Sequence, residues 1–105
     1  MKRYEVLFRS RARKDLIALY RYIRKQSSPR IAANYIVRVE KVCLSLASFP
    51  KRGTAVASHL SGLRTMGFER RATILFRVGE DKAEILRVYY GGQDLEPDLK
   101  RLLGL

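Results

Sequence analysis

The sequence predicts a small α+β domain in which a helical hairpin packs on one face of an antiparallel sheet. Two patterns predict this class. Through the first half of the chain, apolar residues recur every three or four positions, as on one face of a helix. Between residues 63 and 90 the period changes to two, which is typical of half-buried strands. The 105 residues suffice for one hydrophobic core, so residues 1–105 are interpreted as a single domain.

The first two elements are predicted to be a strand and a helix. Residues 3–8 alternate between polar and apolar side chains, which favours a short strand. Residues 11–26 have helical spacing, and Ser10 before them is the residue type that caps a helix N-terminus. The apolar stripe of this helix consists of Ala12, Leu16, Leu19 and Ile23, with Ile17 and Tyr20 beside it.

A second helix is predicted to follow after a very short connection. Ser28 is a suitable cap, and Pro29 fits the first helical turn. The helix should run to about Phe49, where Pro50 should end it. Its apolar positions are Ala32, Ile36, Val39, Cys43 and Leu46. Because few residues join the two helices, they should form an antiparallel hairpin.

The rest of the chain is predicted to form a loop, three strands and a short helix. The loop covers residues 50–62, and Gly79 to Lys82 supply a turn between the last two strands. The strands are expected at residues 63–66, 70–78 and 83–90, and the helix at residues 94–103. The order is therefore β-α-α-β-β-β with a C-terminal helix, and the sheet is expected to offer one face to the hairpin.

The charge of the chain is strongly positive. It has 22 basic and 10 acidic residues, which gives a formal net charge of +12. Such an excess suggests an anionic partner: nucleic acid, an acidic protein or a membrane surface. Arginine outnumbers lysine by 15 to 7, which favours paired contacts with carboxylate or phosphate groups. The alternative is that the charge only keeps the surface solvated.

Several classes of protein are excluded by composition. A single cysteine, Cys43, leaves no internal disulfide, and with the single histidine, His59, it leaves no zinc cluster of Cys and His ligands. No apolar run approaches the ~18 residues that a membrane-spanning helix needs, and no signal peptide is visible. A cytoplasmic protein without a metal or cofactor is therefore expected. Cys43 lies on an apolar stripe and is interpreted as a core residue.

Seven segments together resemble a known family. They are SRARKDLIALYRYI at residues 10–23, AANYI at 32–36, SFPKRG at 48–53, GLR at 62–64, ILFRV at 74–78, EILRV at 84–88 and GGQD at 91–94. The first is similar to the pattern AxxDLxxIxxYI and the third to xFPxxG. In this order and spacing, they resemble the ParE family of bacterial toxins, within the RelE/ParE superfamily. The sequence departs from the family at Tyr90, where a histidine is common.

The resemblance implies the toxin of a type II toxin–antitoxin system. ParE-like toxins inhibit DNA gyrase and so block DNA replication, which leads to growth arrest and to plasmid stabilization. A cognate ParD-like antitoxin with an acidic C-terminal segment neutralises the toxin, and a higher-order toxin–antitoxin complex can form. The antitoxin is expected to lie against the helical hairpin and along the sheet. A membrane is not an expected partner.

A second function that fits the superfamily is ribosome-dependent mRNA cleavage of the RelE type. Cleavage without a metal needs a general base, a general acid and cations around the phosphate. Thr73 occupies the position where the RelE-like pattern places an arginine, and neither tyrosine nor histidine follows Tyr90. We therefore expect that the chain is not an enzyme and has no catalytic residues. A basic nucleic-acid-binding module is a third possibility.

Two groups of residues are candidates for binding. If a three-residue turn sets the register of the last two strands, one outward sheet face carries Arg71, Arg77, Arg87 and Tyr89, together with Ile85. A register shifted by one residue would move Arg87 and Tyr89 to the other face. The target-binding candidates are Arg64, Arg71, Arg77, Arg87 and Tyr89. The antitoxin-binding candidates are Leu19, Tyr20, Tyr22, Ile23 and Tyr35. The alternatives are arginine stems that only cover the sheet and aromatic residues at the edge of the core.

Overall fold

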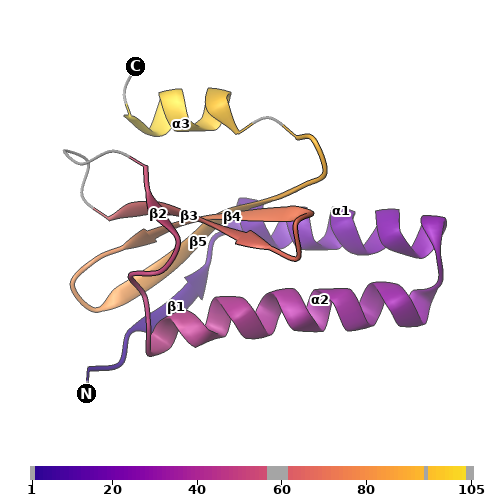
Figure 1. The fold of residues 1–105 in the computed structure, drawn as a ribbon, viewed down its shortest axis with the longest axis horizontal. Helices are drawn as coiled ribbons and strands as arrows, with labels where there is room; N and C mark the ends of the chain where they lie inside the picture. The colour runs from indigo at the N-terminus through magenta and orange to yellow at the C-terminus, as the bar shows by residue number, and fades with distance from the viewer. Residues whose placement is uncertain (1, 57–61, 94, 104–105) are drawn as a thin grey trace.

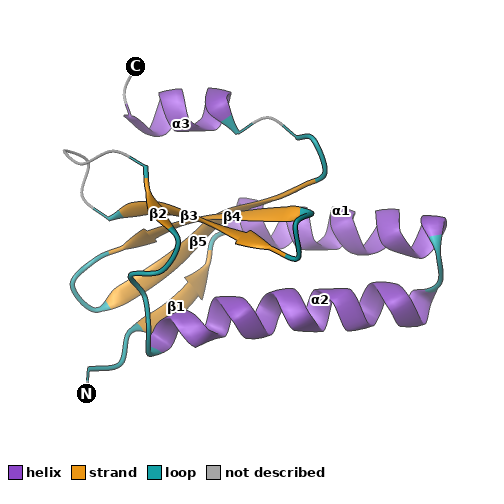
Figure 2. Ribbon diagram, in the orientation of Figure 1, coloured by secondary structure: helices purple, strands orange, loops and turns teal. Residues whose placement is uncertain are grey.

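The computed structural model describes residues 2–56, 62–93 and 95–103, and Figure 1 shows that they form three layers. The elements are β1 (Glu5–Phe8), α1 (Ser10–Gln26), α2 (Pro29–Leu44), the 3-10 helix η1 (Ser45–Ala47), β2 (Thr54–Ala55), β3 (Leu63–Phe68), β4 (Ala72–Val78), β5 (Lys82–Tyr90) and α3 (Glu96–Leu103). The hairpin of α1 and α2 lies on one side of the sheet, and α3 lies on the other (Figure 2). The predicted α+β class is confirmed.

The sheet is mixed, which corrects the prediction of an antiparallel sheet. Its strand order is β1-β5-β4-β3-β2. Strands β2 to β5 pair antiparallel, but β1 pairs with β5 in parallel, with Glu5 opposite Lys82 and Phe8 opposite Ile85. Alternating apolar residues predict a strand but do not specify the direction of its neighbour. The two-residue strand β2 also lies in the segment predicted as a loop.

The helix ends show which capping predictions were right. The Ser28 side chain accepts a hydrogen bond from the Ile31 N–H at 3.2 Å, which confirms it as the cap of α2. At α1 the prediction was wrong, because the helix begins at Ser10 and its N-cap is Arg9, without a side-chain hydrogen bond. The second helix is also shorter than predicted and ends at Leu44. Ser45 donates its hydroxyl to the Val42 carbonyl at 2.5 Å, and the chain tightens there into η1.

The main core lies between the helical hairpin and the sheet. The predicted stripe of α1 is buried there, together with side chains from α2 and the central strands. The largest fully buried side chains in this cluster are Phe76, Leu46, Ile74, Ile85, Val39 and Cys43. Burial raises the pKa of the Cys43 thiol to about 12, so the thiol stays protonated at neutral pH. The interpretation of Cys43 as a core residue is confirmed.

A second, smaller core lies on the opposite face of the sheet, where α3 packs. Its buried residues are Leu63, Leu75 and Tyr89, and Leu95, Leu99 and Leu102 from the C-terminal segment pack against them. This part of the sheet was expected to face outward and to be free for binding. That expectation was wrong, because the apolar side of α3 covers it.

A β-bulge between β4 and β5 sets which side chains lie on which face. Leu75 pairs with Arg87 and Phe76 pairs with Ile85, so Leu86 is the extra residue of β5. Ile85 therefore packs in the main core beside the helices, not on the face of Tyr89 as the sequence predicted. The predicted register assumed an unbroken alternation, whereas the residues of β5 that face the main core change phase between Ile85 and Val88.

Candidate functional site

The most connected polar cluster of the structure, which we call the Arg87 clamp, joins α1, β5 and α3. Its members are Asp15, Arg87, Tyr89 and Asp98. The Arg87 guanidinium donates two hydrogen bonds to Asp15, from Nε at 2.7 Å and from Nη2 at 2.9 Å. Its Nη1 donates to Asp98 at 2.6 Å. Asp98 also accepts from the Tyr89 hydroxyl at 2.6 Å, and Asp15 accepts from the Val88 N–H at 2.8 Å.

The clamp is largely shielded from water, which determines its electrostatics. The side chains of Arg87, Asp15 and Asp98 are only 15%, 15% and 13% exposed. Burial and the hydrogen bond to Asp98 raise the pKa of Tyr89. The pKa of Asp98 is lowered, mainly by the hydrogen bond that it accepts from Tyr89. The positive charges of Arg87, Arg101 and Arg11 lower it further. At neutral pH the cluster therefore holds a protonated phenol and paired charges, which suits a structural joint between three elements.

The target-binding candidates are not brought together in the structure. Arg77 and Arg87 line the same cleft at one end of the sheet. Arg64 instead donates from Nε to the Arg52 carbonyl at 2.8 Å and so holds the segment before β2. Arg71 is exposed at the other end of β4, near Tyr90. Tyr89 is only 4% exposed, so it has little surface for a partner while α3 is in place.

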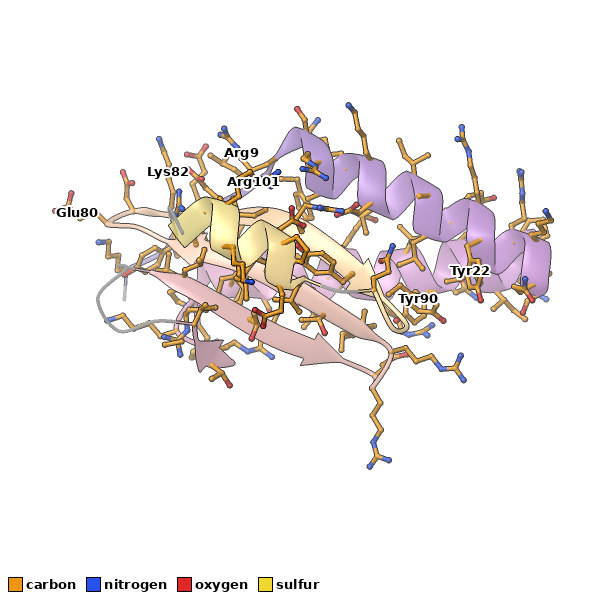
Figure 3. The ribbon with its side chains drawn as sticks, turned by 90° about the horizontal axis from the view of Figure 1, so that it is seen from above. Arg9, Tyr22, Glu80, Lys82, Tyr90 and Arg101 are labelled. Carbon is orange, nitrogen blue, oxygen red and sulfur yellow. The ribbon has the colours of Figure 1, made fainter. Side chains whose placement is uncertain are left out.

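The antitoxin-binding candidates are also divided. Leu19, Ile23 and Tyr35 are buried in the main core, with 5%, 7% and 7% exposure. Tyr20 is half-buried and lines a groove on the helical hairpin. Tyr22 is exposed and packs edge-on against Tyr90, with ring centroids 5.8 Å apart. Figure 3 shows this pair well to the right of Arg9 and Arg101.

Tyr90, the departure from the family pattern, belongs to a row of aromatic side chains. Its ring packs edge-on against Tyr22 on one side and against Tyr35 on the other, with 5.8 Å between centroids in both pairs. Tyr35 in turn packs against Phe68 at 5.7 Å. A tyrosine at position 90 therefore joins β5 to both helices of the hairpin, a packing role that the sequence did not indicate.

A groove between α1 and α2, which we call the hairpin groove, was not predicted from the sequence. It has a volume of about 520 Å³ and is lined by Phe8, Arg13, Leu16, Ile17, Tyr20, Ile36 and Glu40. Ile17 is 52% exposed, and on α2 Val37 and Leu44 are 45% and 54% exposed. Apolar residues outside the core stripes were the signal that could have located this surface. Val37 and Leu44 lie outside the lining of the groove, so Ile17 is the exposed large apolar side chain within it. An apolar groove on the surface is typical of a protein-docking surface.

Within residues 2–56, 62–93 and 95–103, His, Cys, Asp and Glu side chains form no group of three that could hold a metal ion. His59 lies outside the described residues. In the described part of the chain, every helix is too short or too polar to cross a membrane.

The family follows from a comparison with known protein families. The family described as "ParE toxin of type II toxin-antitoxin system, parDE" matches residues 6–95. The chain belongs to the ParE toxin family. The match covers β1 from Val6 onward, both helices of the hairpin, strands β2 to β5 and the residues up to the start of α3. The resemblance stated from the sequence motifs is confirmed. A comparison with curated protein sequences gave no match.

Solved structures of toxin–antitoxin systems contain chains with the same fold as this ParE toxin. One similar structure is the chromosomal ParDE toxin–antitoxin system from P. aeruginosa, with a TM-score of 0.72 and 24% identity over 84% of this chain and 96% of that chain. Another is the toxin–antitoxin complex RelBE2 from Mycobacterium tuberculosis, with a TM-score of 0.57 and 25% identity over 89% of this chain and 97% of that chain.

Proposed function

We propose that this ParE toxin acts in the cytoplasm by inhibiting DNA gyrase, and that a cognate ParD-like antitoxin neutralises it. The observation that carries the proposal is the family match over residues 6–95 on a RelE/ParE-like fold. In this mechanism the toxin works by binding: it stabilises the state of gyrase in which the DNA is cleaved. The exposed cations of the cleft that contains Arg77 contribute to docking on the target.

The hydrogen bonds of the polar residues on the α3 side of the sheet favour a toxin that acts by binding over one that cleaves RNA. An RNA-cleaving site needs a free general base and a cation that can reach the phosphate. Here the Arg87 guanidinium is held by Asp15 and Asp98, and the Tyr89 hydroxyl donates to Asp98. Thr73, the position where RelE-like toxins have an arginine, is half-buried on β4 opposite Tyr89.

Purified gyrase tests the proposed target. The toxin is added to gyrase, ATP and relaxed plasmid, and supercoiled and linear DNA are measured after protease treatment. We expect supercoiling to fall and linear DNA to accumulate as toxin is added, and the antitoxin to reverse both effects. If neither product changes at any toxin concentration, gyrase is not the target.

The similarity to the RelBE2 complex favours one alternative function, a ribosome-dependent mRNA endonuclease. This alternative predicts cut transcripts in a translating extract, while plasmid DNA stays intact. Mapping the 5′ ends of a reporter mRNA, with and without the toxin, detects such cuts. Toxin-dependent ends within codons would support the ribonuclease and count against gyrase as the target.

The hairpin groove is the surface that best fits the antitoxin. It combines apolar side chains with Arg13 and Glu40, which lie at its edges on α1 and α2. An amphipathic helix can bury its apolar face in such a groove while its acidic residues meet the basic surface of the toxin. This assignment replaces the buried candidates Leu19, Ile23 and Tyr35 with Ile17 and Ile36, which line the groove, and keeps Tyr20.

We predict that Ile17→Glu weakens binding of the antitoxin by roughly 10-fold or more, because the change places a charge in the apolar groove. Ile31→Glu is the matched control, since Ile31 is 54% exposed on α2 and does not line the groove. Calorimetric titration of each variant with the antitoxin measures the effect. Equal affinity for the two variants would show that the antitoxin does not bind in this groove.

A further inference from the structure

A cleft at the N-terminal end of α1, which we call the arginine cleft, gathers cations from four parts of the chain. It has a volume of about 720 Å³. Arg9 lies at the junction of β1 and α1, and Arg11 and Arg13 follow in the first turn of α1. Figure 3 shows Arg9 close to Arg101 of α3, and both line the cleft. Six arginines line the cleft: Arg9, Arg11, Arg13, Arg77, Arg87 and Arg101.

The carboxylates near the cleft neutralise only part of this charge. Asp98 is shared, since Arg87 and Arg101 contact it at 2.6 and 2.8 Å and Arg11 lies 3.9 Å from it. Among the described residues, Arg9 and Arg77 form no ion pair. Glu84 is the one acidic residue in the lining. The cleft therefore carries an excess of positive charge that an anion would balance.

The start of α1 adds to this excess. Backbone N–H groups at a helix N-terminus carry partial positive charge, and proteins usually place acidic or capping side chains there. In α1 the first turn has no acidic residue, and the N-cap Arg9 makes no side-chain hydrogen bond to it. Cations at this end are unfavourable for the toxin alone, and a bound anion would remove the repulsion.

The positive charge continues from the cleft along the outer surface of α1. Arg11, Lys14, Arg21 and Lys25 are all exposed, and their spacing of three, seven and four residues places them on one helix face. This basic stripe lies opposite the buried face of α1 and extends over most of its 17 residues, a length of about 21 Å from Arg11 to Lys25. Asp15, the acidic residue of α1, is bound to Arg87 and does not neutralise the stripe.

We propose that the arginine cleft and the basic stripe bind the phosphodiester backbone of duplex DNA without sequence preference. Regularly spaced phosphates along a strand match a row of cations better than the scattered carboxylates of a peptide. The four residues of the stripe carry no large apolar side chain, whereas the adjoining hairpin groove, which shares Phe8 and Arg13 with the cleft, offers Ile17 to the apolar face of an acidic amphipathic peptide. This inference does not depend on gyrase as the target, because it concerns the toxin and DNA alone.

Fluorescence anisotropy of a labelled duplex of mixed sequence, titrated with the full toxin chain, tests the proposal. With about four phosphate contacts, affinity should fall roughly 100-fold between about 50 and 200 mM KCl. Lys14→Gln and Arg9→Gln should each weaken binding and lower the slope of log affinity against log salt by about 1. Lys41→Gln is the matched control, because Lys41 is exposed on α2, outside the cleft and the stripe.

Three results would overturn the proposal. One is the absence of binding to the duplex at the lowest salt concentration. Another is an equal loss of affinity in Lys14→Gln and Lys41→Gln, which would mean that binding follows net charge and has no defined surface. The third is displacement of DNA by poly-glutamate at equal charge concentration with the same dependence on Lys14 and Arg9, which would assign the surface to an acidic protein.

Discussion

Leu16→Asp is expected to abolish the folded structure. Leu16 is 8% exposed and packs in the main core between α1, α2 and the sheet. An unpaired carboxylate at such a site costs several kcal/mol, and a domain of this size is stable by only about 5–15 kcal/mol. We expect far-UV circular dichroism to record a cooperative thermal transition for the unchanged protein and none for the variant.

The neighbouring residue provides a matched control. Ile17 is 52% exposed in the hairpin groove, so Ile17→Asp leaves the new carboxylate in water. It should melt within a few degrees of the unchanged protein. If Leu16→Asp also melts cooperatively at a similar temperature, the position of the main core described above is wrong.

Arg87→Met is expected to destabilise the protein by about 3–5 kcal/mol, because it leaves two carboxylates shielded from water without their cation. Asp15 and Asp98 are only 15% and 13% exposed, and both accept hydrogen bonds from Arg87. The change should also loosen α3, since Asp98 ties that helix to β5. Urea unfolding followed by circular dichroism measures the shift of the midpoint.

Arg77→Met is the control for the clamp. Arg77 lines the same arginine cleft but forms no ion pair among the described residues, so its loss should cost less than about 1 kcal/mol. Equal destabilisation by the two variants would show that the Arg87 clamp does not hold the three elements together.

Toxicity assays that test the surface of the sheet should use Arg77→Glu. In Arg87→Glu, a loss of binding could not be separated from a loss of stability.

The local elements of this fold could be predicted from the sequence. The stripe of Ala12, Leu16, Leu19 and Ile23 has the period of a helix, and all four side chains are buried. The cap at Ser28 has a recognisable residue type followed by proline. These features depend on neighbours in the chain, so their signal is contained in short segments.

The long-range features could not be predicted in this way. Asp15 and Arg87 are 72 residues apart in the sequence, and no local pattern indicates that they meet. The bulge at Leu86 and the docking of α3 on the sheet depend on the same tertiary contacts. As a result, the sequence placed Arg87 and Tyr89 on the correct face of β5 but treated that face as open.

The binding residues were harder to predict than the fold for a related reason. Apolar residues on a helix can face the core or the surface, and Leu19 and Ile23 are buried while Ile17 is exposed. The position of the sheet relative to α1 determines which of these apolar side chains are buried. The charge of +12 indicated an anionic partner, but the concentration of arginines in one cleft depends on the meeting of β1, α1, β4, β5 and α3.

The most direct test of the proposed function compares DNA synthesis with protein synthesis in cells. The toxin is induced without its antitoxin, and incorporation of labelled thymidine and labelled methionine is followed from the moment of induction. The gyrase mechanism predicts that thymidine incorporation stops first while methionine incorporation continues. Immediate arrest of methionine incorporation with continuing DNA synthesis would contradict it.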